Sequence, residues 1–243
     1  MRTLTFAKRN LKEILRDPLN LSFLFGFPVV LLLLLSAIQA NIPVSMFEIE
    51  HLAPGVMVFG LAFMTLFSAT LIAKDRMSSF MHRLYTTPMT PVDFILGYTL
   101  PLIPIAMMES IATYLVAMLL GLSFSINLLL SVVFMIPIAM LYIGLGLLCG
   151  SVFNDKQVGG ICGALLTNVS AWLSGIWFDL DLVGGAFRQI AELLPFVHAV
   201  EMERAVVAGD LLGAVPHLLW VVGYAIAVLI LAVFAFLRQM KRQ

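Results

Sequence analysis

The stretch KDRMSSFMHRLYTTPMTPVDF, residues 74–94, separates two long apolar runs and carries five charged side chains and two Thr-Pro pairs. This polarity is unusual here, because only 12% of the 243 residues are charged, 61% are hydrophobic and the mean hydropathy is +1.04. A soluble domain has roughly 25% charged residues, so the composition predicts an integral membrane protein. The net charge is zero, and without a basic field we expect no nucleic-acid partner.

Six apolar runs are long enough to span a bilayer, because a hydrocarbon core of about 30 Å requires about 20 helical residues. Pro101 and Pro104 lie in the third run and predict that it is kinked, tilted or partly interfacial. We therefore predict an all-α integral membrane protein with a single transmembrane domain over residues 1–243. The predicted spans are residues 19–38, 54–73, 91–120, 128–150, 158–177 and 215–237.

The positions of Lys and Arg predict the orientation of these spans, since cytoplasmic segments carry an excess of both residues. If both termini are cytoplasmic, all 14 Lys and Arg residues lie on the cytoplasmic side except Arg188 and Arg204. We therefore expect six spans with both termini inside a prokaryotic-type plasma membrane.

Residues 1–18 have the pattern of an amphipathic helix. Their apolar side chains fall within one arc of about 100° when drawn at 3.6 residues per turn, and their cations lie on the other side. This predicts a helix on the cytoplasmic membrane surface, although a basic tail that serves only topology is the alternative. The apolar residues are Leu4, Ala7, Leu11, Ile14 and Leu15, and the cations are Lys8, Arg9, Lys12 and Arg16.

The polar stretch itself contains a helical pattern, with Met77, Phe80, Met81 and Leu84 on one face. Pro88 disfavours helix at the preceding residue and so ends this short helix. Residues 90–93, Thr-Pro-Val-Asp, then form a typical helix start with an N-cap Thr and a Pro at the first position. The exposed apolar face can pack against lipid or into a groove on another protein.

Two segments resemble ABC-2 type transporter permeases, the membrane subunits of ABC exporters. The first is DRMSSFMHRLYTTPMTPVDFILGY, residues 75–98, and the second is LSGIWFDLDLVGGAFRQIAELLPFVHAVEMERAVVAGD, residues 173–210. The first departs from the family pattern at two positions. Asp75 stands where Glu is usual, and His82 stands near the position where the family usually has a Glu. The second has Phe-Asp-Leu-Asp where a Pro often follows Ser-Gly.

This resemblance implies that the loop after span two is a coupling helix that docks on a separate ATPase subunit. The chain has no G-x-x-x-x-G-K-[ST] segment of its own, so ATP and Mg²⁺ would bind to the partner and this chain would hold no cofactor. We expect two ATPase copies, a second permease copy forming a homodimer, and surrounding lipid. The implied ATPase-coupling residues are Asp75, Arg76, Met77, Phe80, Leu84, Thr87 and Pro88, with residues 151–158 as a weaker contact.

Glu109 is the only acidic residue well inside a predicted span. A carboxylate in the membrane is costly unless it is paired or protonated, so Glu109 has a role either in substrate passage or gating, or in packing. Two G-x-x-x-G pairs, at Gly146 and Gly150 and at Gly159 and Gly163, favour close helix packing within one subunit over a dimer contact.

The segment after span five predicts two amphipathic helices that are broken near Leu194 and Pro195. The family resemblance makes this segment a re-entrant gate near the substrate exit, and a solvated surface hairpin is the alternative. The predicted gating or translocation-path residues are Glu109, Ser174, Gly175, Pro195, Glu201 and Arg204.

Two other functions are less well supported by the sequence. A secondary transporter requires coupling residues in its core, where this chain offers one acid. An intramembrane protease would use Ser174 with His198 or His217, but Trp172 occupies the usual Gly position, and no metal motif is complete. We predict an ATP-driven exporter subunit for an amphiphile, such as a drug-like molecule, a lipid or a lipid-linked glycan.

Overall fold

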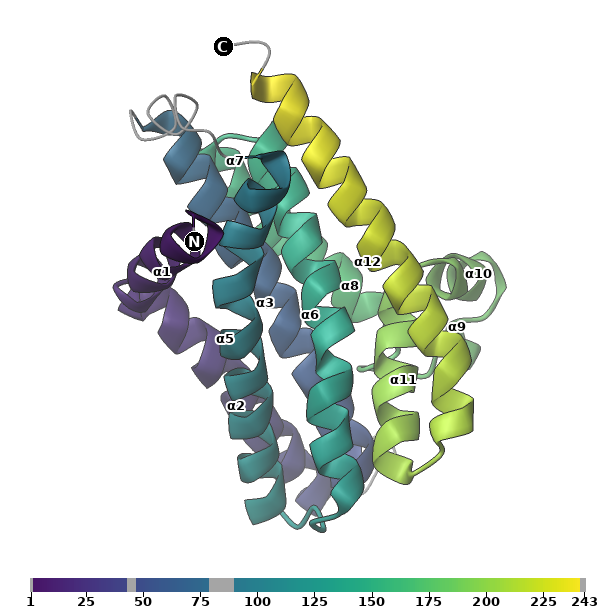
Figure 1. The fold of residues 1–243 in the computed structure, drawn as a ribbon. Coiled ribbons are helices and arrows are strands. Elements are labelled where there is room, and N and C mark those ends of the chain that lie inside the picture. Colours follow the sequence, from purple (N-terminus) through teal and green to yellow (C-terminus); the bar gives the residue numbers. More distant parts are fainter. Residues whose placement is uncertain (1, 43–46, 79–89, 241–243) are drawn as a thin grey trace.

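The computed structural model describes residues 2–42, 47–78 and 90–240, and every regular element in these ranges is a helix (Figure 1). The predicted all-α class is therefore confirmed for the described part of the chain. The elements are α1 (Arg2–Leu15), α2 (Pro18–Asn41), α3 (Ile49–Met77), α5 (Pro91–Leu119), α6 (Ile126–Val152), α7 (Asp155–Val158), the π-helix η2 (Gly159–Leu166), α8 (Thr167–Trp172), α9 (Leu180–Val183), α10 (Gly185–Leu193), α11 (Pro195–Ala208) and α12 (Leu211–Met240).

Five helices in the described ranges are long and apolar enough to cross a membrane. They correspond to the predicted spans one, two, three, four and six, and α5 continues through both of its internal prolines. Four of them extend beyond the predicted bounds, and the third agrees with its prediction within one residue. The five are Pro18–Asn41, Ile49–Met77, Val92–Leu119, Ile126–Val152 and Leu211–Gln239.

The predicted fifth span, residues 158–177, is different. The chain is helical there from α7 to the end of α8, but η2 divides this run, and Thr167 Oγ1 donates to the carbonyl oxygen of Cys162 at 2.8 Å. The run then ends before a turn in which Gly175 has a φ of +71°, a conformation that favours glycine. Hydropathy cannot reveal a π-turn, which depends on local hydrogen bonding. The described chain thus has five long spans and one divided helical segment, and six unbroken spans are not confirmed.

Helix α3 forms the centre of the bundle. In its most apolar stretch 83% of the residues are buried, compared with 17% in α2 and 22% in α12. Figure 1 shows α2 and α12 on opposite flanks, with α3, α5 and α6 between them. Large apolar side chains such as Phe23, Leu34 and Phe234 are exposed on these flanks, as expected for helices that face lipid.

Small residues bring α3 and α6 together. A Cβ atom on Gly146 would collide with the carbonyl oxygen of Thr65, and one on Gly150 would lie 2.6 Å from the carbonyl oxygen of Ala69. The prediction that Gly146 and Gly150 allow close packing within one subunit is therefore confirmed. At Gly159 no atom lies within 4 Å of an added Cβ, so that position makes no such contact.

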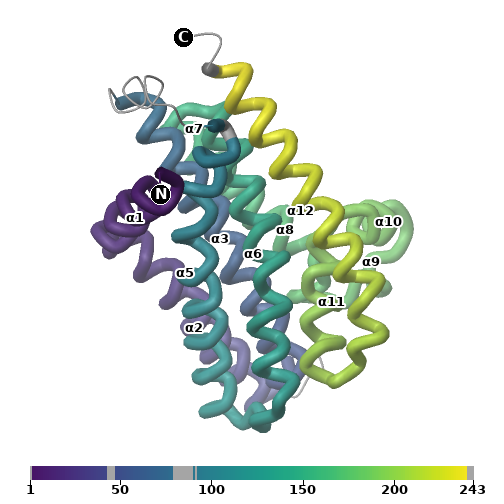
Figure 2. The backbone as a smooth tube through the Cα atoms, in the orientation of Figure 1, coloured from purple at the N-terminus to yellow at the C-terminus, as the bar shows by residue number. Residues whose placement is uncertain are grey.

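The two ends of the bundle carry different structures. Figure 2 shows the C-terminal ends of α3 and α12 at one end, where α7 also lies and α1 crosses α5. The turns that join α5 to α6 and α11 to α12 lie at the opposite end, and the short helices α9 and α10 lie beside α12. One candidate site lies at the α1 end, and the other lies between the start of α3 and helices α9 to α12.

Candidate functional site

A buried carboxylate joins three helices at the α1 end of the bundle. Asp75, near the C-terminus of α3, is 2% exposed. Arg9 of α1 donates to both of its carboxylate oxygens at 2.5 and 2.7 Å, and the Tyr98 hydroxyl of α5 donates to it at 2.6 Å. Burial alone would lower the pKa of Arg9, but the hydrogen bond and charge of Asp75 raise that pKa above its ordinary value. We call the side chains of Arg9, Asp75 and Tyr98 the ionic hub.

The sequence of α1 explains why the hub forms. Its buried face includes Phe6, whose ring lies 5.0 Å from that of Tyr98 and 5.4 Å from that of Phe94. Gly97 makes this possible, because a Cβ atom there would collide with the Phe6 ring. Asn10 is fully buried on the same face and donates to the Gly97 carbonyl oxygen at 2.9 Å. Helix α1 therefore packs against α5 through a face that contains both apolar side chains and the polar Asn10.

The start of α5 has the predicted cap. The Asp93 backbone N–H donates to Thr90 Oγ1 at 3.2 Å, and the Thr90 backbone N–H donates to the Asp93 carboxylate at 3.0 Å. Both interactions of a capping box are present. Thr3 of α1 also donates to Asp93 at 2.5 Å, so the cap is connected to the same helix as the ionic hub.

The predicted coupling residues fall into three groups. Asp75 belongs to the ionic hub, and Arg76 donates to the carbonyl oxygens of Gly150 and Phe153 at 2.7 and 3.2 Å, which joins α3 to the end of α6. Met77 is 74% exposed. The remaining predicted residues lie outside the described part of the chain, and these are Phe80, Leu84, Thr87 and Pro88.

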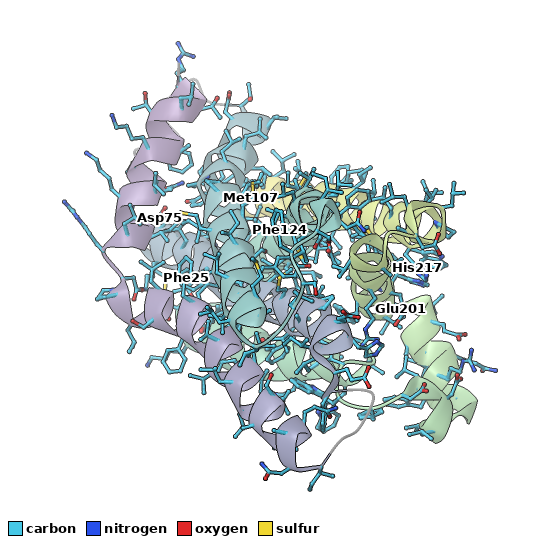
Figure 3. The ribbon with its side chains drawn as sticks, turned by 90° about the horizontal axis from the view of Figure 1, so that it is seen from below. Phe25, Asp75, Met107, Phe124, Glu201 and His217 are labelled. Carbon is cyan, nitrogen blue, oxygen red and sulfur yellow. The ribbon has the colours of Figure 1, made fainter. Side chains whose placement is uncertain are left out.

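A polar cavity of about 580 Å³ lies on the side of the bundle away from α1, between the start of α3, the turn after α8, and helices α9 to α12. Figure 3 shows Glu201 and His217, which line it, on the opposite side of the molecule from Asp75. We call this the outer cavity. Its charged and imidazole side chains are those of His51, Asp179, Asp181, Arg188, Glu192, His198, Glu201, Arg204 and His217.

Arg204 holds one wall of the outer cavity together. Its guanidinium group pairs with Glu201 at 2.8 Å and donates to the carbonyl oxygens of Gly175 and His51 at 3.2 and 3.4 Å. The predicted residues Gly175, Glu201 and Arg204 therefore meet at one place. Through Arg204, α11 is connected both to the start of α3 and to the turn after α8.

Two other predicted residues near this region do not line the cavity. Ser174 is buried and donates to the Ala171 carbonyl oxygen at 2.8 Å, while Pro195 begins α11. His198 and His217 face each other instead, with their Nδ1 atoms 2.8 Å apart. A hydrolase dyad needs its serine bonded to the base, which this arrangement does not provide. The described residues also contain no group of three or more His, Cys, Asp or Glu that could hold a metal ion.

The family model that describes ABC-2 type transporters matches residues 1–207, which include the ionic hub and most of α11. The chain belongs to the ABC-2 type transporter family. It is thus a multi-pass membrane permease, and the family implies association with an ABC ATPase. No curated protein matches this chain.

Glu109 of the permease points into the bundle. Its side chain is fully buried, and Oε1 accepts a hydrogen bond from Thr113 at 3.2 Å. A Cβ atom on Gly60 of α3 would collide with Oε1, so the carboxyl group packs directly against the α3 backbone. Oε2 has no hydrogen-bond partner among the described residues. This geometry favours the packing interpretation of Glu109, and a role in substrate passage stays a prediction.

A second buried acid of the permease was not among the predicted residues. Glu203 of α11 is fully buried and accepts a hydrogen bond from Ser131 of α6 at 2.6 Å, and Ser131 also bonds to Tyr114 of α5. The sequence contains the signal, because Glu203 follows buried Phe196 and Val200 at helical spacing. Its partners come from distant helices, so only the tertiary structure identifies them.

Proposed function

We propose that this permease is the membrane subunit of an ATP-driven exporter and that two copies form a path for an amphiphilic substrate. Two separate ATPase subunits bind ATP and Mg²⁺ and dock against the loop between α3 and α5, residues 79–89, on the cytoplasmic side. Both termini lie on that side, and the outer cavity faces the exterior. The substrate is drug-like or lipid-like, or a lipid-linked glycan.

The ionic hub is the observation that carries this proposal. Residues 79–89, which would contact the ATPase, follow the end of α3, whose last turn contains Asp75 and Arg76. The hub and the Arg76 contacts connect the end of α3 to α1, α5 and α6. A displacement of the loop would therefore move several helices together, because packed interfaces transmit strain as units.

The outer end supports the second half of the proposal. Arg204 joins α11 to α3 and to the turn after α8 through one guanidinium group. Rotation of α11 would break or remake these contacts, which fits a gate at the exit of the path. An amphiphile fits this architecture, since the exposed flanks of the permease are apolar and the outer cavity is polar.

Purification of the permease together with its ABC ATPase tests this proposal. Phe80→Asp or Leu84→Asp places a charge on the apolar face predicted for the coupling helix. We expect either variant to enter the membrane at the normal level and to lose the ATPase during purification.

Leu182→Asp is the matched control, because Leu182 is an exposed leucine on α9, a helix that lies beside α12 and away from α1 (Figure 1). It should retain the ATPase. Normal recovery of the ATPase with both Phe80→Asp and Leu84→Asp would refute the assignment of the docking loop.

A further inference from the structure

The outer cavity adjoins an apolar groove on α12. The groove has a volume of about 420 Å³ and is lined by Leu219, Trp220, Gly223, Tyr224 and Ala227. We propose that cavity and groove form one binding site for a cationic amphiphile, with its amine or quaternary ammonium headgroup in the cavity and its alkyl chain in the groove. This inference rests on the proposed function and specifies the substrate class.

The two parts share a wall. His198 lines the cavity, and its ring stacks on that of Trp220 with centroids 4.9 Å apart and an interplanar angle of 14°. Trp220 lines the groove and stacks in turn on Tyr224, whose hydroxyl donates to the Leu193 carbonyl oxygen at 2.7 Å. An elongated molecule can therefore extend from one to the other along a continuous aromatic surface.

The charges of the cavity select a cation. Its lining holds four carboxylates and two guanidinium groups, which leaves two negative charges when the histidines are neutral. Both guanidinium groups already have carboxylate partners, since Arg188 bridges Asp181 and Glu192 and Arg204 pairs with Glu201. Among the described residues no cation lies within ion-pair distance of Asp179, which is exposed. An anionic headgroup would therefore meet a net repulsion, and a cationic one would complete the pairing.

The aromatic wall suits the part of the ligand that leaves the cavity. Trp220 and Tyr224 line the groove and not the cavity, so their rings offer a large apolar surface to the first carbons of the chain, next to the headgroup. Trp220 is 40% exposed, so its surface is accessible from outside the bundle.

The groove suits an alkyl chain. Leu219, Gly223 and Ala227 follow one another at intervals of four residues on α12. The distance from the first to the third is about 12 Å along the helix axis. No atom lies within 4 Å of a Cβ atom added at Gly223, so the space beside this glycine, next to Trp220 and Tyr224, is open. The groove lies on a flank whose large apolar side chains are exposed, so the chain can enter from the surrounding lipid.

Photolabelling of the purified full-length permease in uncharged maltoside micelles tests the site. The probe is dodecyltrimethylammonium carrying a diazirine near the chain end, and the counter-probe is the dodecyl sulfonate with the same diazirine. We expect the ammonium probe to label α12 within residues 219–227 and to outcompete the sulfonate at that position. Equal labelling by the two probes, or ammonium labelling only elsewhere, would overturn the proposal.

Two pairs of variants locate the headgroup and the chain. Asp179→Asn removes the carboxylate that lacks an ion pair and should weaken ammonium labelling about two- to fivefold, as expected for a solvent-accessible charge pair. Glu50→Gln removes an exposed carboxylate at the same end that does not line the cavity, and it should have no effect. Gly223→Leu fills the groove and should abolish labelling there, whereas Gly26→Leu, at another glycine with free space around it, should not. If neither Asp179→Asn nor Gly223→Leu changes labelling, the site is wrong.

Because labelling needs no ATPase, this inference and the proposed function can fail separately. Two results together support both the binding site and the exporter proposal. The ammonium probe labels α12 selectively, and the ATPase is lost during purification only from the Phe80→Asp and Leu84→Asp variants. An exporter complex that is intact but shows no charge-selective labelling refutes the cationic ligand and leaves the exporter proposal standing. Selective labelling of a permease that binds no ATPase refutes the exporter proposal and leaves the binding site.

Discussion

The ionic hub and the outer cavity contain similar charged side chains but differ in how far these side chains are exposed. At the ionic hub, Arg9 pairs with a carboxylate, that of Asp75, which is 2% exposed and is also bonded by Tyr98. In the outer cavity, Arg188 and its carboxylate partners are about half exposed and surround open space. Charges that are buried and fully bonded fix the relative position of helices, while charges that line a cavity remain available to a ligand.

The helices around the two sites also differ in length and packing. The hub connects α1, α3 and α5, two of which are among the longest elements, and aromatic rings seal it. The outer cavity is walled partly by α9 and α10, helices of four and nine residues that are separated by Gly184 and have one buried residue each. The 14-residue α11, which also lines the cavity, is well packed. Short elements with few buried contacts open at lower free energy than long packed helices. We therefore expect one end to transmit movement and the other to change shape.

Asp75→Ala should have the largest effect, because it removes the buried acceptor of both Arg9 and Tyr98. The Arg9 guanidinium is then left with the half-exposed Glu13 as its ion-pair partner, at 2.6 Å. Removing one member of a buried pair costs about 3 to 5 kcal/mol, and we expect the lower end of this range because the Arg9 side chain is 34% exposed. A loss of about 3 kcal/mol should lower the melting temperature of the purified permease by roughly 6 °C or more. In the assembled complex, the stimulation of the partner's ATPase activity by the permease should fall as well.

The double variant Arg9→Met with Asp75→Leu controls for this. It removes both charges and should recover part of the lost stability, because apolar residues can replace a buried pair. If it recovers stability but not ATPase stimulation, the hub has a coupling role beyond packing. A single Asp75→Ala variant as stable as the natural permease would contradict the description of the hub.

Gly146→Ala should have the next largest effect. The added Cβ would collide with the Thr65 carbonyl oxygen, which belongs to the backbone of α3 and cannot rotate away. Separating α3 from α6 should cost about 1 to 3 kcal/mol, as overpacking usually does. Thermal unfolding measures this loss, and Gly159→Ala, with free space around the added atom, should cause little change. Equal stability of the two variants would contradict the close α3–α6 contact.

Local sequence patterns predicted five of the long helices and the N-terminal cap of one of them, α5. Apolar runs gave the five long spans, and residues 90–93 gave the cap of α5, because these features depend on neighbours in the chain. The division of residues 155–172 by η2 escaped prediction, since a π-turn leaves no mark in hydropathy.

The sites were predicted only in part, for a related reason. The sequence identified Asp75, Glu201 and Arg204 as important, but a charge in a loop pattern looks the same whether it faces a partner or its own chain. The Asp75 side chain is buried because it accepts hydrogen bonds from Arg9, which lies 66 positions earlier in the chain, and from Tyr98. Glu203 was missed because its partner Ser131 belongs to another helix.

Glu203 allows a finer test of how α11 is held. Glu203→Gln keeps the shape and an acceptor for Ser131 but carries no charge, so we expect stability to stay equal or to rise slightly, since a buried carboxylate without a cation is costly. Glu203→Ala should cost about 1 to 3 kcal/mol, because it removes the acceptor and leaves a void. Thermal unfolding of both variants checks this. A large loss in Glu203→Gln would show that the charge itself is needed.

Arg188→Gln should have the smallest effect on stability and therefore sharpens the contrast between the two ends. Arg188 pairs with Asp181 and Glu192, but all three side chains are about half exposed, and exposed ion pairs contribute little. We expect no measurable change in melting temperature, in contrast to Asp75→Ala. Removing this cation adds one net negative charge to the outer cavity, so labelling by the ammonium probe should increase. A fall in melting temperature comparable to that of Asp75→Ala would mean that the outer charges are structural, and the two ends would then differ in exposure but not in role.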